Sequence, residues 1–131
     1  MRAPDWRARL AAFIEARRAT PFVWGAHDCC LFAADAVLAM GGPDVAAPLR
    51  GYASRFGALR RLRRAGFTRV FDVVDTAFPV GARAREGDVV GVPAWPLDAL
   101  MIAHDAASAW GQDERGLVRL PIPDGAVIWS V

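Results

Sequence analysis

Residues 24–32 of the chain read WGAHDCCLF and place Asp28 directly before two adjacent cysteines, Cys29 and Cys30. Aspartate is a preferred residue at the N-cap of a helix, and apolar residues recur at helical spacing after it, up to a pair of glycines. The stretch therefore predicts a helix over residues 28–40 that begins with the cysteine pair in its first turn.

A disulfide between the two cysteines is not expected, because one trans peptide holds their Cα atoms about 3.8 Å apart, below the usual bridged separation. As free thiols they have three open roles: packing, metal binding and nucleophilic chemistry. A zinc site of His27, Cys29, Cys30 and His104 is the weakest of these, because paired zinc ligands are usually spaced by two or more residues. No metal and no cofactor is expected.

Cys29 is the candidate nucleophile if the pair has chemistry. Backbone N–H groups without helical partners and the positive end of the helix dipole both stabilise a thiolate at a helix start. Cys30 points about 100° further round the helix, so only one of the two thiols is expected to face a given cleft. Spacing alone favours the packing role over chemistry.

The composition is that of one folded domain, expected to span residues 1–131. Hydrophobic residues make up 54% and charged residues 23%, which excludes a disordered chain. The net charge of +2 gives no argument for a nucleic-acid partner. No secretory signal and no membrane span is expected, because no apolar run approaches about 18 residues. The chain is therefore expected to be made in a cytoplasm.

The period of the apolar residues changes along the chain. Helical spacing predicts helices over 5–18 and 55–65 and a short one around 71–78, so the helical part covers about residues 1–80. Short β-rich stretches separated by turn residues predict strands over about 86–131. Helices followed by strands predict an α+β fold with an antiparallel sheet backed by the helices.

The stretches PFVWGAHDCCLFAADAVLAMGG, REGDVVGV and GLVRLP together resemble a compact group of NlpC-like proteins. These are papain-like cysteine hydrolases found among phage tail and tail-assembly proteins. The most specific match is the Trp-Gly-x-x-Asp-Cys-x-x-Phe pattern of residues 24–32. The resemblance implies a papain-like NlpC-type fold, with Cys29 as the nucleophile that attacks amide bonds in peptidoglycan stem peptides.

The chain departs from the family pattern at the general base. The wider family opens the strand after the Gly-Asp-Val strand with a histidine, and the matching position here is Ala99. His104 follows five residues later, an odd offset that places its side chain on the other face of a regular strand. His27 is the other candidate base, beside the nucleophile in sequence. Trp24, Asp28 and Trp95 are the candidate substrate-binding residues.

Two functions follow from the resemblance. In the first, the protein is a tail-tip hydrolase that cuts peptidoglycan during host entry, with a degraded catalytic site. In the second, it is an inactive plug or adaptor of the tail tip, because a fold does not by itself imply its function. In both, the expected partners are tail-tip or hub proteins, with peptidoglycan as a further partner of the hydrolase, and the protein is assembled into the virion tail.

The predicted helix over 55–65 is rich in arginine at Arg60, Arg61, Arg63 and Arg64. A solvated face is the first interpretation of such a run. The functional interpretation is contact with an acidic partner protein or with wall carboxylates. Contact with nucleic acid is the third and least favoured interpretation of this run, because no aromatic residues interleave with these arginines.

Overall fold

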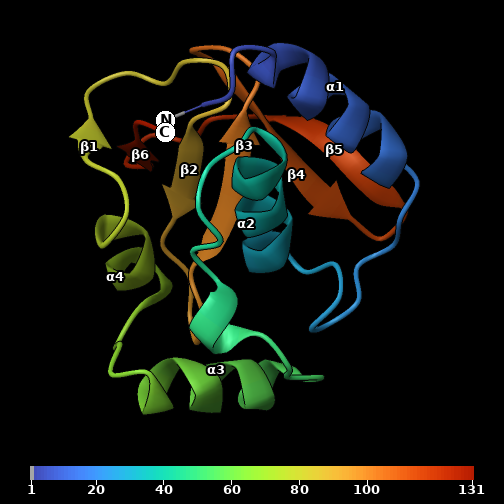
Figure 1. The fold of residues 1–131 in the computed structure, drawn as a ribbon. Helices are drawn as coiled ribbons and strands as arrows, with labels where there is room; N and C mark the ends of the chain where they lie inside the picture. Colours follow the sequence, from blue (N-terminus) through green and yellow to red (C-terminus); the bar gives the residue numbers. More distant parts are fainter. Residues whose placement is uncertain (1) are drawn as a thin grey trace.

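The structure, a computed structural model, describes residues 2–131 and has the α+β architecture predicted from the sequence (Figure 1). Within these residues the helices are α1 (Trp6–Arg17), α2 (Cys29–Ala39), α3 (Arg55–Arg64) and α4 (Val70–Asp75), with a short 3-10 turn, η1 (Ala47–Leu49). The predicted helices over 5–18, 28–40 and 55–65 are confirmed to within one residue at each end, and the short fourth helix is confirmed around its first half.

The described chain forms a six-stranded antiparallel sheet in the order β1-β6-β2-β3-β4-β5. The strands are β1 (Val80–Gly81), β2 (Val89–Val92), β3 (Ala99–Ala103), β4 (Ser108–Asp113), β5 (Gly116–Pro121) and β6 (Val127–Trp129). Each predicted β-rich stretch after residue 86 contains one strand. β1 precedes that boundary and was not predicted, because two residues carry no readable alternation.

The helices contribute to a core on one face of the sheet. Leu100 and Ile102 of β3 join the apolar core that the helices build, whereas Met101 and Ala103 belong to a smaller cluster on the opposite face. This alternation is the two-residue period of an extended strand. Figure 1 shows α2 lying along β3, with α1 at one end of the molecule and α3 at the other.

Trp129 anchors the β1-β6-β2 side of the core. Its side chain is fully buried, packs edge-on against the Phe71 ring and donates its indole N–H to a carboxylate oxygen of Asp75 at 2.7 Å. Gly91 leaves room for both rings, since a Cβ there would lie 2.5 Å from Phe71 and 2.6 Å from Trp129. The central strand β2 can therefore carry only glycine at this position.

Asp28 is the N-cap of α2, as predicted. Its buried carboxylate accepts the backbone N–H of Leu31 at 2.9 Å and the backbone N–H of Gly25 at 3.0 Å, and it also accepts the hydroxyl of Tyr52. Burial and this hydrogen bond raise the pKa of Tyr52, so the hydroxyl stays protonated and donates. One carboxylate thus joins the start of α2 to the loops on either side of it.

No helix among residues 2–131 combines the length and the apolar character needed to cross a bilayer.

Replacing Asp28 by alanine should cost far more stability than loss of an ordinary helix cap. The change leaves three donors without their partner at a buried site, so we expect the free energy of unfolding to fall by about 3 to 5 kcal/mol. The matched control is Ser54→Ala, which removes the exposed N-cap of α3 and should cost about 1 kcal/mol. Urea unfolding of both variants measures the difference, and similar losses would show that Asp28 acts only as a local cap.

Candidate functional site

Cys29 is the first residue of α2, directly after the Asp28 cap. Its position exposes the thiol to the unpaired N–H groups and the positive end of the helix dipole. These are the conditions from which the sequence predicted a reactive cysteine.

Cys29 meets the sheet at the place where β3 and β4 separate. β2 pairs with β3 from Ala99 to Ile102, but β4 pairs with β3 only at Ile102 and Ala103. Beyond that point the β3 edge facing β4 has no strand partner, and the backbone N–H of Leu100 is available to the Cys29 thiol. The preceding residue is Ala99, the position matched to the family's histidine, and it shares the sheet face of Met101 and Ala103, opposite the face that carries the helices.

The two thiols have opposite electrostatic environments although their sulfurs are 3.9 Å apart. The hydrogen bond from the Cys30 thiol lowers the pKa of Cys29, burial opposes this, and the Leu100 N–H lowers the pKa further. The same hydrogen bond and burial raise the pKa of Cys30 well above its ordinary value. The backbone oxygen of Asp98, 3.7 Å from the Cys30 sulfur, is an alternative acceptor for the single thiol proton of Cys30. Of the two thiols, Cys29 is therefore the one that ionises first.

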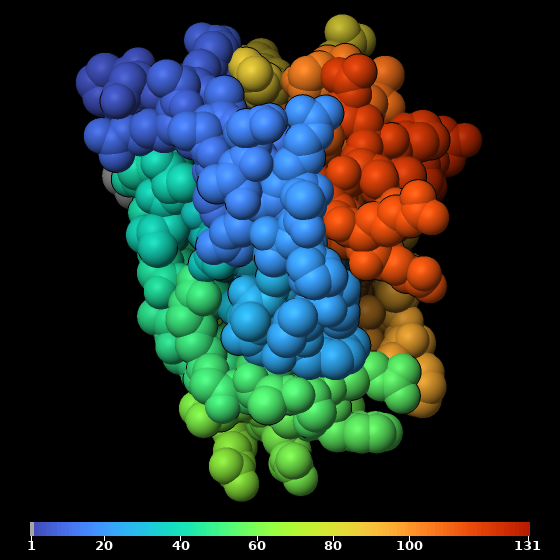
Figure 2. All heavy atoms as spheres, turned by 90° about the vertical axis from the view of Figure 1, so that its right-hand side faces the viewer, coloured from blue at the N-terminus to red at the C-terminus, as the bar shows by residue number. Residues whose placement is uncertain are grey.

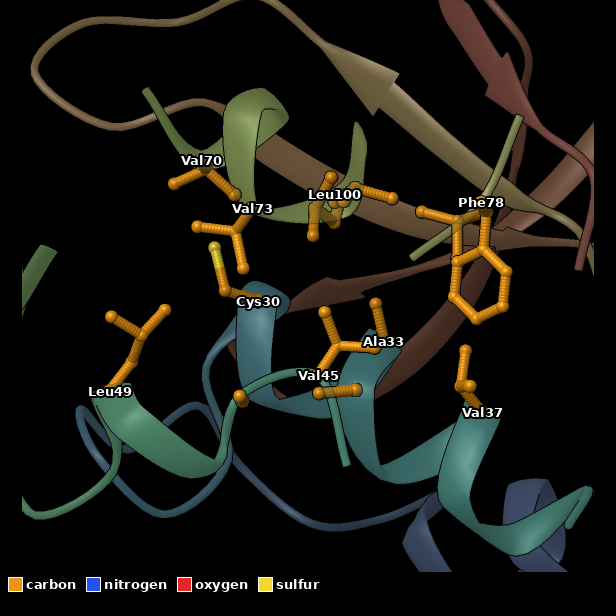
Figure 3. Close-up of a pocket in the computed structure, with 13 residues that line it drawn as sticks. Cys30, Ala33, Val37, Val45, Leu49, Val70, Val73, Phe78 and Leu100 are labelled. Atoms are coloured by element: carbon orange, nitrogen blue, oxygen red, sulfur yellow. The ribbon is translucent and has the colours of Figure 1, made fainter. Parts of the chain in front are cut away.

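Cys30 lines a small apolar hollow between α2, η1 and α4 (Figure 3). Val45, Leu49, Val73 and Leu100 are among the other lining side chains. The hollow supplies no acid or base from a side chain, because its lining residues are aliphatic apart from Cys30 and Phe78. It suits the packing role that the sequence allowed for one of the two cysteines.

His27 is buried and turned toward the helices. Its Nδ1 atom lies 3.1 Å from the guanidinium of Arg17, and its ring packs edge-on against Phe32, one turn into α2. Burial and the nearby Arg17 charge lower the pKa of His27, which keeps the ring neutral. Because Arg17 donates to Nδ1, the ring proton sits on Nε2, which has no hydrogen-bond partner.

His104 lies beyond the C-terminal end of β3, whereas Cys29 contacts the beginning of that strand. Four residues separate Leu100 from His104, about 13 Å along a strand at roughly 3.3 Å per residue. The His104 side chain lines a hollow against α1 together with Leu10, Ile14 and Arg18. The structure therefore does not bring His104 to Cys29.

The three candidate substrate-binding residues are placed differently. Asp28 is 1% exposed and its carboxylate is fully used inside the fold, so it has no contact left for a substrate. Trp24 is half-buried, packs edge-on against Phe22 and lines a hollow with Cys30 and Tyr52. Trp95 is 92% exposed on the loop between β2 and β3. The structure thus places Trp24 beside Cys30, leaves Trp95 on an exposed loop and uses Asp28 inside the fold.

Gln112 is a residue beside the candidate site that the sequence analysis missed. It lies on β4 past the point where β4 leaves β3, and its side-chain amide donates to the backbone oxygen of His27 at 2.8 Å. This bond holds the loop before α2 against the separated strand. Its amide oxygen is buried without a partner. Its only signal in the sequence is a polar residue at a position that strand alternation assigns to the side of the sheet covered by the helices.

Within residues 2–131 no group of three or more histidine, cysteine, aspartate or glutamate side chains is arranged to hold a metal ion.

Cys29 should react with iodoacetamide faster than Cys30 at neutral pH, because only Cys29 has a lowered pKa. Its labelling rate should rise at a lower pH than that of a free thiol. Replacing Cys30 by alanine removes the hydrogen bond that lowers the pKa of Cys29 and should shift the profile to higher pH. Mass mapping after brief labelling measures both rates, and equal rates or preferential labelling of Cys30 would contradict the assignment.

The chain was compared with protein families, curated proteins and solved structures. No curated protein and no solved structure matches it. A family model described as a domain of unknown function, DUF6950, matches residues 1–131. The chain therefore belongs to the DUF6950 family.

Proposed function

We propose that this protein is a phage tail-tip component with an NlpC-like, papain-like cysteine-hydrolase fold that serves as a structural plug or adaptor after losing its general base. The sequence pattern around Trp24–Phe32 supports the family part of the proposal. The position of Cys29 supports the fold part. This cysteine begins a helix that lies along an antiparallel sheet, and it lies next to the strand that follows the Gly-Asp-Val strand.

The observation that carries the loss of activity is the absence of an imidazole at Cys29. His27 faces Arg17 and Phe32, His104 lies at the far end of β3, and these are the only two histidines in the chain. A thiolate can attack an amide carbonyl without a base, but expulsion of the amine needs a proton donor. The donor nearest to Cys29 is the thiol of Cys30, whose raised pKa makes it a weak acid.

A cysteine amidase acting on peptidoglycan stem peptides is the second candidate. The lowered pKa of Cys29 favours it, because a preformed thiolate is the nucleophile in such reactions. The backbone N–H groups at the start of α2 would stabilise the oxyanion of the tetrahedral intermediate. This candidate needs a partner protein to supply the missing proton donor.

The isolated chain should release no more soluble peptide from purified peptidoglycan than its Cys29→Ala variant does. Each proton transfer by a positioned side chain typically contributes about 10²- to 10⁴-fold in rate, and this chain lacks that group at its thiol. Detection of new amino termini after incubation measures hydrolysis. Robust activity that disappears in Cys29→Ala and in His27→Ala or His104→Ala would overturn the adaptor proposal.

Placing a histidine at Ala99 tests whether the remaining geometry is that of a hydrolase. Ala99→His should give no measurable hydrolysis, because Ala99 pairs with Val92 and shares the face of Met101 and Ala103, which points away from α2 and Cys29. The matched control is Ala94→His, which adds a histidine in the exposed loop before β3 and should give no gain. A gain in Ala99→His that Cys29→Ala abolishes, and that Ala94→His does not show, would contradict this prediction and show that a side chain at position 99 reaches the thiol.

A further inference from the structure

Basic charge is concentrated in one segment of the chain. Residues 46–71 hold seven of the sixteen arginines and no aspartate or glutamate, whereas the other nine arginines share the rest of the chain with all fourteen carboxylates. The net charge of +2 conceals this separation. The centre of the basic segment is α3.

The basic side chains of α3 face solvent without partners. Arg60, Arg61, Arg63 and Arg64 are exposed, and the ion pairs within residues 2–131 involve only arginines outside α3. Arg60 with Arg63, Arg60 with Arg64 and Arg61 with Arg64 are three or four residues apart, spacings at which like charges on a helix repel one another. Arg60 and Arg64 lie on the side of the helix opposite the buried Leu62, and Arg61 and Arg63 flank that side.

α3 stands at one end of the molecule, away from the sheet, and its segment (green) projects from the lower edge of the space-filling view (Figures 1 and 2). Phe56 is 64% exposed at the start of the helix, with the guanidinium of Arg55 5.3 Å from its ring centre. The loop that carries the exposed Trp95 lies beside the helix, because Leu97 and Leu62 line one hollow. Exposed aromatics next to arginines are the composition typical of protein interfaces.

We infer that the basic face of α3 is a docking surface for a carboxylate-rich segment of a partner protein. Guanidinium groups bind carboxylates through paired hydrogen bonds, and a carboxylate-bearing partner would relieve the repulsion among the unpaired arginines. This surface is independent of the thiol site, so the inference holds whether or not Cys29 is catalytic.

The dimensions and surroundings of the surface favour a protein over other polyanions. The ten residues of α3 span about 15 Å at 1.5 Å per residue. Duplex DNA carries a negative charge about every 1.7 Å along its axis, so it would extend past α3 and meet the rest of the chain, which is acidic. A bilayer surface would require a broad apolar face on α3, and Phe56 is the one large apolar residue of the helix that is exposed.

The test compares binding of a labelled poly-glutamate peptide by fluorescence anisotropy at low ionic strength. The Arg60→Glu/Arg64→Glu variant should weaken binding by about tenfold or more, because two attractive contacts become repulsive. The matched control is Arg83→Glu/Arg115→Glu, which makes the same change in net charge at exposed arginines outside the basic segment and should have little effect. Thermal unfolding checks that both variants fold, and Arg60→Gln/Arg64→Gln replaces the first if it does not.

Absence of poly-glutamate binding by the native chain would overturn the inference, and so would equal weakening by the control variant. Duplex DNA and vesicles containing phosphatidylserine serve as the competing ligands. Tighter binding of either one, at matched charge concentration, would assign the surface to nucleic acid or to a membrane and would likewise overturn it.

Discussion

The carboxylate of Asp28 is the interaction on which the other features depend. It accepts hydrogen bonds from Gly25 before the helix, from Leu31 inside the helix and from Tyr52 on a distant loop. Close backbone packing accompanies these bonds, since a Cβ at Gly25 would lie 1.8 Å from the backbone oxygen of Tyr52. Gly25 also has a φ of 81°, which glycine adopts without strain. The cap therefore fixes two loops as well as the helix start.

Both functional surfaces follow from that constraint. Asp28 sets the first turn of α2, which presents Cys29 to the open edge of β3. Through Tyr52 it also fixes the chain just before α3, which carries the unpaired arginines. The thiol site and the basic surface are thus held by one buried group, although they use different residues and different chemistry.

Local rules were sufficient to predict the elements of the fold. Helical spacing and the Asp28 cap located three helices, and short β-rich stretches between turn residues located every strand after residue 86, because each of these signals lies within a few neighbouring residues. The N-cap rule identified Asp28 but could not reveal its bond to Tyr52, 24 residues away. The same limit applies to the separation of β3 from β4, which depends on how the loop before α2 docks against Gln112.

The candidate site shows why adjacency in sequence is a poor guide to catalytic pairing. His27 is two residues from Cys29, yet its ring is held in the opposite direction by Arg17 and Phe32. A buried neutral imidazole beside a guanidinium contributes packing and one hydrogen bond, not proton transfer to a thiol outside its reach. Meanwhile Cys30 hydrogen-bonds to the nucleophile and fills an apolar hollow, which is a structural reason to keep a cysteine pair without catalysis. The chain thus combines a cysteine of lowered pKa that has no histidine partner with a projecting helix that carries exposed arginines, and the adaptor proposal rests on that combination.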